Sequence, residues 1–129
     1  MRYADLIGIP FKLGGRGPDC FDCFDCYGLV RFLIERHTGR VIPDYETPED
    51  AGRVQALMAV ERLFWHPLPA AVPGSVVLFR LGREACHVGY VLSHGLFIHA
   101  WEKSSGVTVE RLALWERRIE GFYEYTEAA

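Results

Sequence analysis

The chain has 129 residues, half of them hydrophobic, and a formal net charge of -3. This length and apolar content suit one domain with its own core, so we expect residues 1–129 to form a single domain. The charge argues against nucleic acid as a partner, and the apolar stretches are shorter than the roughly 18 residues that span a membrane.

The first half of the chain predicts helices separated by loops. Residues 3–7 suit a short helix, and the glycine-rich segment 13–18 predicts a loop. From residue 26 to residue 37 the apolar residues recur with helical spacing, and Gly39 is a plausible stop. A proline-containing connector then leads to a second helical pattern over residues 49–63.

The second half predicts strands. Three prolines between residues 67 and 73 indicate a rigid link, and residues 115–125 form an amphipathic piece that can close the sheet. Strands are expected over 75–81, 86–92, 96–100 and 107–112. Helices followed by hairpin-linked strands are typical of the α+β class. We therefore expect a central helix, beginning at Cys26, packed on an antiparallel sheet of about five strands.

Three cysteines each follow an aspartate, in the steps Asp19-Cys20, Asp22-Cys23 and Asp25-Cys26. The chain starts without a signal peptide, so we expect it to be made in the cytoplasm, where thiols stay reduced. The spacing matches the first three ligands of a bacterial iron–sulfur run, but no Cys-Pro follows, and an aspartate before each thiol opposes thiolate formation. A metal site stays a minor alternative, and we expect neither metal nor cofactor. Cys86 suits a buried strand position.

Cys26 differs from the other cysteines because a helical pattern begins at it. Unpaired backbone N–H groups and the positive end of the helix dipole stabilise a thiolate in a first helical turn. A nucleophilic thiol also needs a base. His87 and His99 lie in apolar strand patterns, and neighbouring antiparallel strands could place them side by side. The remaining histidines suit surface or turn positions: His37, His66 and His94.

The order of motifs resembles the NlpC family of papain-like cysteine peptidases, which cleave peptide bonds in bacterial peptidoglycan. The matching segments, in chain order, are Gly8-Ile9-Pro10-Phe11-Lys12-Leu13-Gly14-Gly15, Asp25-Cys26-Tyr27-Gly28, Pro73-Gly74-Ser75, His87-Val88-Gly89-Tyr90 and Phe97-Ile98-His99-Ala100. Each motif alone is weak, but five in this order cover nearly the whole chain.

The resemblance implies a papain-like NlpC fold and a role for each site residue. Cys26 would be the nucleophile, His87 the general base and acid, and His99 the residue that orients His87. The backbone N–H of Cys26 would stabilise the oxyanion. The family has a tyrosine where this chain has Phe11, so a second oxyanion donor is expected elsewhere, with Tyr27 and Tyr3 as candidates.

The substrate implied by the resemblance is a peptidoglycan stem peptide, cut at the γ-D-glutamyl bond to diaminopimelate or at another stem bond. Tyr27 after the cysteine, the run Gly14-Gly15-Arg16 and the lack of a signal peptide resemble the phage-tail branch of the family. That branch implies tail proteins as partners and a place in the virion tail, acting on the cell wall.

Two other functions stay open on the sequence. The same three residues could serve an acyltransferase or amidase that acts on a small acyl substrate. A non-catalytic structural module of a tail could also keep the fold, and the phenylalanine at position 11 is its main support.

Overall fold

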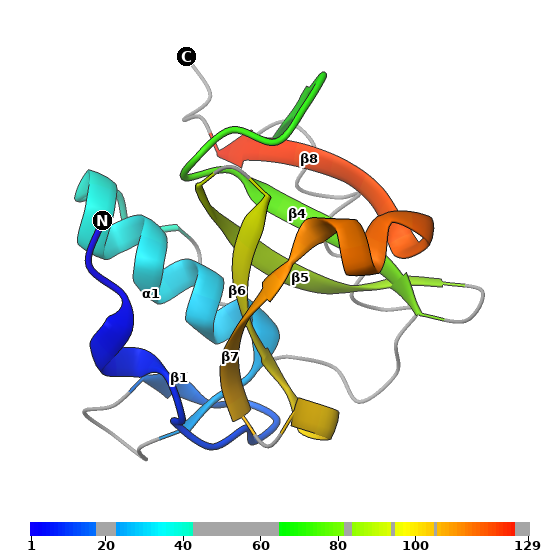
Figure 1. Ribbon diagram of the computed structural model, residues 1–129. Coiled ribbons are helices and arrows are strands. Elements are labelled where there is room, and N and C mark those ends of the chain that lie inside the picture. Colours follow the sequence, from blue (N-terminus) through cyan, green and yellow to red (C-terminus); the bar gives the residue numbers. More distant parts are fainter. Residues whose placement is uncertain (18–22, 43–64, 82–83, 94, 105, 126–129) are drawn as a thin grey trace.

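Figure 1 shows a helix lying along one face of a twisted sheet, in a computed structural model of the chain. The structure describes residues 1–17, 23–42, 65–81, 84–93, 95–104 and 106–125. The helix, α1, packs against the central strands of a six-stranded antiparallel sheet. The predicted α+β class is therefore confirmed, with six strands in this sheet where about five were expected. The helix predicted over 49–63 lies outside the described residues.

The main helix lies in the first part of the chain, and all strands of the six-stranded sheet follow it. In chain order they are η1 (Ala4–Leu6), β1 (Arg16–Gly17), β2 (Cys23–Phe24), α1 (Cys26–Thr38), β3 (Trp65–Leu68), β4 (Val76–Leu81), β5 (Glu84–Ser93), β6 (Leu96–Trp101), η2 (Glu102–Ser104), β7 (Gly106–Arg111), η3 (Leu112–Arg118) and β8 (Ile119–Tyr125), where η marks a 3₁₀ helix. The short first helix and the strands expected over the second half are thus present.

Helix α1 begins and ends where the sequence indicates. Asp25 is its N-cap, and its carboxylate accepts a hydrogen bond from the Gly28 N–H. The spacing of the apolar residues buries one face of the helix, formed by Leu29, Val30, Leu33 and Ile34. The helix stops because Gly39 takes a left-handed conformation, with φ of 75°, and donates its N–H to the carbonyl of Glu35.

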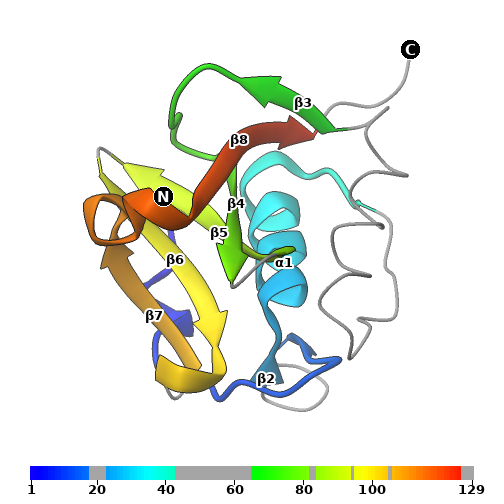
Figure 2. The ribbon, with the colours of Figure 1, turned by 90° about the vertical axis from the view of Figure 1, so that its right-hand side faces the viewer.

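The sheet has the order β3-β8-β4-β5-β6-β7, with β3 and β7 at its edges. The segment 67–73 was expected to be a rigid link, and this is wrong for its first part, because β3 includes Pro67. Pro67 lies opposite Tyr123 of β8, and it is tolerated because an edge strand has no second neighbour that needs its N–H. Figure 2 shows β3 outside β8.

Two further segments differ from or refine the expectation. The glycine-rich segment 13–18 contains β1, which pairs with β2 in a two-stranded ribbon, so it is not irregular throughout. The segment 115–125 closes the sheet as predicted, but it does so in two parts, the end of η3 and the whole of β8, which inserts between β3 and β4.

Side-chain alternation along the strands gives the sheet two buried faces. The face toward α1 carries a cluster that includes Leu78, Val88, Ile98 and Ala100. The opposite face carries Val77, Phe79, Val91 and Phe97, and η3 covers it with Leu112 and Trp115. Among the described helices, none is long and apolar enough to cross a membrane.

Candidate active site

The start of α1 is organised by one buried carboxylate. Asp25 is 1% exposed, and its carboxylate accepts hydrogen bonds from the N–H of Gly28 at 2.7 Å and the N–H of Gly14 at 2.8 Å. The guanidinium of Arg16 donates to the same carboxylate at 2.8 Å. These bonds tie the loop before β1 to the first turn of the helix, at whose first position Cys26 lies buried.

Two glycines allow this close approach of loop and helix. A Cβ atom on Gly28 would lie 2.0 Å from the carbonyl oxygen of Gly15. A Cβ atom on Gly15 would lie 2.8 Å from the backbone of Cys23. Any side chain at either position would therefore push the loop away from the helix start, which gives the Gly14-Gly15 run and the glycine two residues after Cys26 a physical reason.

The ion pair between Arg16 and Asp25 also reduces the net negative charge beside the thiol. From the sequence alone, an aspartate next to Cys26 opposes thiolate formation. In the structure the guanidinium lies against that carboxylate, so the pair adds little net negative charge next to the cysteine. The same guanidinium lies 5.7 Å from the centroid of the Tyr27 ring. The sequence analysis assigned no such role to Arg16 or Asp25.

The two strand histidines lie side by side in the buried face opposite α1. Nε2 of His87 on β5 lies 2.7 Å from Nδ1 of His99 on β6. His87 is 3% exposed and His99 is 0% exposed. The neighbouring antiparallel strands thus bring together the two imidazoles that the sequence analysis singled out.

Aromatic rings enclose the histidine pair. The centroid of the His87 ring lies 5.7 Å from that of Phe79, and the centroid of the His99 ring lies 4.7 Å from that of Phe97. Trp115 from η3 packs against both histidines, with centroid distances of 6.2 Å and 5.2 Å. This enclosure keeps water from the two imidazoles and so favours their neutral form.

Burial disfavours the charged form of both rings. It lowers the pKa of His87 to about 3, with a further contribution from the charge of His99. Burial also lowers the pKa of His99, although the neighbouring Glu110 carboxylate opposes this shift. Both histidines are therefore neutral near pH 7, and a neutral imidazole can accept a proton.

A third residue continues the histidine pair and was missed by the sequence analysis. Oε2 of Glu110, on β7, lies 2.5 Å from Nε2 of His99. Glu110 pairs with Phe97 across β6 and β7, and Phe97 shares a sheet face with His99 because the two are two positions apart. A single charged residue inside the 107–112 strand pattern, on the histidine side of the sheet, is the signal that could have found it.

Cys26 begins the helix that packs against the two strands that carry the histidines. Helix α1 packs against β5 and β6, and Cys26 belongs to the same buried cluster as Val88 and Ala100, the residues that follow His87 and His99. The ring nitrogen of His87 that does not face His99 is Nδ1.

The predicted oxyanion donors lie at the same helix start. The Gly28 N–H is bound by the Asp25 carboxylate, so it does not serve an oxyanion. Cys26 and Tyr27 occupy the first two helical positions, where N–H groups have no partner within the helix. Their predicted role as donors stays a prediction. Phe11, at the position where the family has tyrosine, forms a backbone β-bridge with Phe24 of β2. Phe24 directly precedes Asp25, so position 11 lies close to the helix start.

Metal binding has no support in the described residues, which contain no group of three histidine, cysteine or carboxylate side chains that could hold an ion. Cys23 is buried in β2. Cys20 lies outside the described residues, as does the side chain of Cys86.

The fold and this site define an α+β protein in which a helix begun by a cysteine packs on an antiparallel sheet that carries a buried histidine pair. The chain matches the sequence profile of the NlpC/P60 family over residues 8–123. It therefore belongs to the NlpC/P60 family.

Solved structures of the family share its fold. The NlpC/p60 domain of the peptidoglycan hydrolase SagA is 25% identical, with a TM-score of 0.62 over 95% of this chain and 91% of that one. NlpC1 from Trichomonas vaginalis is 25% identical, with a TM-score of 0.67 over 93% of this chain but 40% of that one. The P60 domain of an antigen from M. avium subspecies paratuberculosis is 23% identical, with a TM-score of 0.61 over 94% of this chain and 86% of that one. No curated protein sequence matches the chain.

The Asp25 cluster predicts a large loss of stability when its carboxylate is removed. Asp25→Ala leaves the Arg16 charge and two N–H groups without this acceptor, and breaking a buried pair in this way costs about 3–5 kcal/mol. Asp25→Asn keeps an oxygen for the Gly28 N–H, so we expect a smaller loss. Urea unfolding measures both. Asp5→Ala, which breaks the exposed ion pair with Arg36, is the control and should cost far less. Equal losses in all three variants would contradict this account.

The buried His87 predicts that the protein loses stability in acid. The folded state leaves His87 unprotonated down to about pH 3, whereas the unfolded chain protonates it near 6.5. Between these values the unfolded state binds more protons, so the free energy of unfolding falls as pH falls, by at most about 1.4 kcal/mol per pH unit from this group. His87→Gln should flatten the slope measured by urea unfolding across this range.

The matched control for this pH dependence is His66→Gln. His66 is exposed on the edge strand β3, so its removal should leave the slope unchanged. A slope that is the same in the wild type and in His87→Gln would show that His87 titrates normally in the folded state.

Proposed function

We propose that this protein is a cysteine peptidase that hydrolyses peptide bonds in the stem peptides of bacterial peptidoglycan. The observation that carries the proposal is the buried pair His87–His99, on the two strands against which the helix begun by Cys26 packs. A thiol nucleophile requires a setting that stabilises the thiolate, such as a first helical turn, and a neutral imidazole that can take its proton. The motif order of the family and the peptidoglycan hydrolase SagA among the similar structures support the choice of substrate.

In the first half of the reaction, Nδ1 of His87 takes the proton of the Cys26 thiol. The thiolate sulfur attacks the carbonyl carbon of the scissile peptide bond, and the oxyanion that forms accepts hydrogen bonds from N–H groups at the start of α1. The C–N bond then breaks, and His87 returns the proton to the leaving amine. The product of this half is a thioester on Cys26.

In the second half, His87 takes a proton from water, and the resulting hydroxide oxygen attacks the thioester carbonyl. The C–S bond breaks, the carboxylic acid product leaves, and the thiol of Cys26 regains a proton from His87. His99 holds the His87 ring in place throughout, through the bond to its Nε2.

We further propose the γ-D-glutamyl bond to diaminopimelate as the target and a phage tail as the place of action. Support for the tail comes from Tyr27 after the cysteine and from Arg16 after the glycine pair, as in the phage-tail branch. These two side chains pack together at the start of α1. Detection of the protein in purified virions of a phage that encodes it would support this placement, and its absence from them would contradict it.

The peptidase proposal predicts that Cys26→Ala abolishes the release of stem-peptide fragments from purified cell wall. The loss should exceed about 100-fold, because the nucleophile itself is removed. Digestion of defined muropeptides followed by mass spectrometry measures it and identifies the bond that is cut.

Cys23→Ala is the matched control, since Cys23 is a second buried thiol three positions earlier in the chain. It should fold and keep its activity. Full activity of Cys26→Ala would overturn the proposal. A wild type that forms an acyl-enzyme with lipid esters but leaves muropeptides intact would favour the acyltransferase.

A further inference from the structure

A continuous chain of hydrogen bonds leads away from the proposed base and ends at a carboxylate. From His87 it passes to Nδ1 of His99 over 2.7 Å, and from Nε2 of His99 to Oε2 of Glu110 over 2.5 Å. The three residues come from three neighbouring strands, β5, β6 and β7. Nδ1 of His87 is the ring nitrogen of the pair that takes no part in this chain of bonds.

The chemistry of the last member fixes the positions of the protons. An ionised carboxylate can only accept a hydrogen bond, so Nε2 of His99 must carry a proton. A neutral imidazole has one N–H, so Nδ1 of His99 carries a lone pair and accepts from Nε2–H of His87. Nε2 of His87 then holds the only proton of that ring.

We propose that Glu110 is a positioning residue that keeps the lone pair of the proposed base on Nδ1 of His87. The other order of protons would place a hydrogen on that nitrogen and leave the Glu110 carboxylate without a donor from His99. A base that already carries a proton on Nδ1 cannot accept the thiol proton there, as the proposed mechanism requires. The position of one carboxylate on β7 thus decides whether the ring on β5 can act.

The surroundings of the chain support this assignment. Burial lowers the pKa of both histidines, so the argument for neutral rings holds near pH 7. The other side chains packed against the two imidazoles are aromatic rings. Among the described residues, Glu110 is the carboxylate bonded to the pair. Strand pairing fixes Glu110 opposite Phe97, beside the His99 ring.

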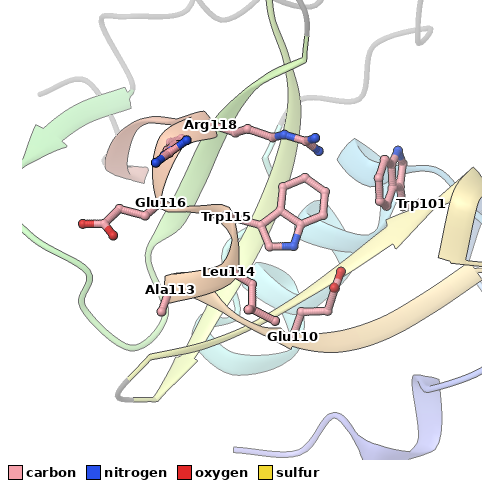
Figure 3. Close-up of a pocket in the computed structure, with 8 residues that line it drawn as sticks. Trp101, Glu110, Ala113, Leu114, Trp115, Glu116 and Arg118 are labelled. Atoms are coloured by element: carbon pink, nitrogen blue, oxygen red, sulfur yellow. The ribbon is translucent and has the colours of Figure 1, made fainter.

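Glu110 is also the member of the chain that meets solvent. Its side chain is 29% exposed and lines a pocket of about 520 Å³ together with Trp101, Trp115 and Arg118. Figure 3 shows the Glu110 carboxylate pointing toward the space between the two tryptophans. The carboxylate thus meets solvent, while both histidines are buried.

Nitrogen NMR of the folded protein with ¹⁵N-labelled histidine tests the proton order directly. In the wild type near neutral pH, Nδ1 of His87 should show the chemical shift of a nitrogen without a proton. In Glu110→Gln the amide can either accept or donate, so the second tautomer of both histidines should appear. A protonated Nδ1 in the wild type, or identical tautomers in the wild type and Glu110→Gln, would overturn the proposal.

A kinetic measurement tests the consequence for catalysis, and this part rests on the proposed peptidase function. Glu110→Gln should lower kcat by about 10-fold to 100-fold with KM unchanged, since a positioned base contributes about 10²–10⁴. An altered tautomer with unchanged kcat would overturn the catalytic role of Glu110. If the wild type cleaves no muropeptide, the peptidase function fails, whereas the NMR result still decides the proton order.

The matched control is Glu116→Gln. Glu116 lines the same pocket, and Figure 3 shows its carboxylate pointing away from Trp115 and Glu110. This variant removes the same charge from the same pocket, so it should leave both the tautomers and kcat unchanged. An equal effect of the two variants would mean that the charge of the pocket, and not the bond to His99, is responsible, and would overturn the proposal.

Discussion

The buried carboxylate of Asp25 is the constraint on which the rest of this structure depends. It binds the backbone of the loop at Gly14, the guanidinium of Arg16 and the first turn of α1 at Gly28. These bonds add to the pairing of β1 with β2 and to the hydrogen bond from the Asp25 N–H to the Gly15 carbonyl, which also hold the loop near the helix start. The same carboxylate caps the helix that presents Cys26, and its ion pair removes most of its own negative field at the thiol. One residue therefore combines a structural and an electrostatic requirement of the site.

The sheet has two buried faces, and each face holds a different part of the proposed site. One face packs apolar side chains against α1 and so positions the cysteine. The other face holds His87, His99 and Glu110 among aromatic rings under η3. A polar chain of this kind is costly to bury unless each member has a partner, and here each imidazole has one.

Much of this arrangement could be predicted from the sequence, because local signals were strong. The spacing of apolar residues after Cys26 and the glycine at 39 defined α1, and alternation with turn residues defined β4 to β7. The histidines were identified because each stands in an apolar strand pattern. What failed depended on tertiary context. Pro67 argued against a strand, and only an edge position could accommodate it. The pairing of Glu110 with His99 arises from strand register, which no local pattern reports.

The insertion of β8 between β3 and β4 has a consequence for how the protein is made. The strand that fills the gap is the last regular element among the described residues, so β3 and β4 cannot share a sheet until residues 119–125 have been synthesised. Until then β4 presents an unpaired edge of mostly apolar residues, Val76, Val77, Leu78 and Phe79, of the type that recruits strands from other molecules. Contacts between segments this far apart in sequence also form slowly. A nascent chain paused before this strand would therefore be most exposed to aggregation, and a chaperone that acts before residues 119–125 emerge would protect it best.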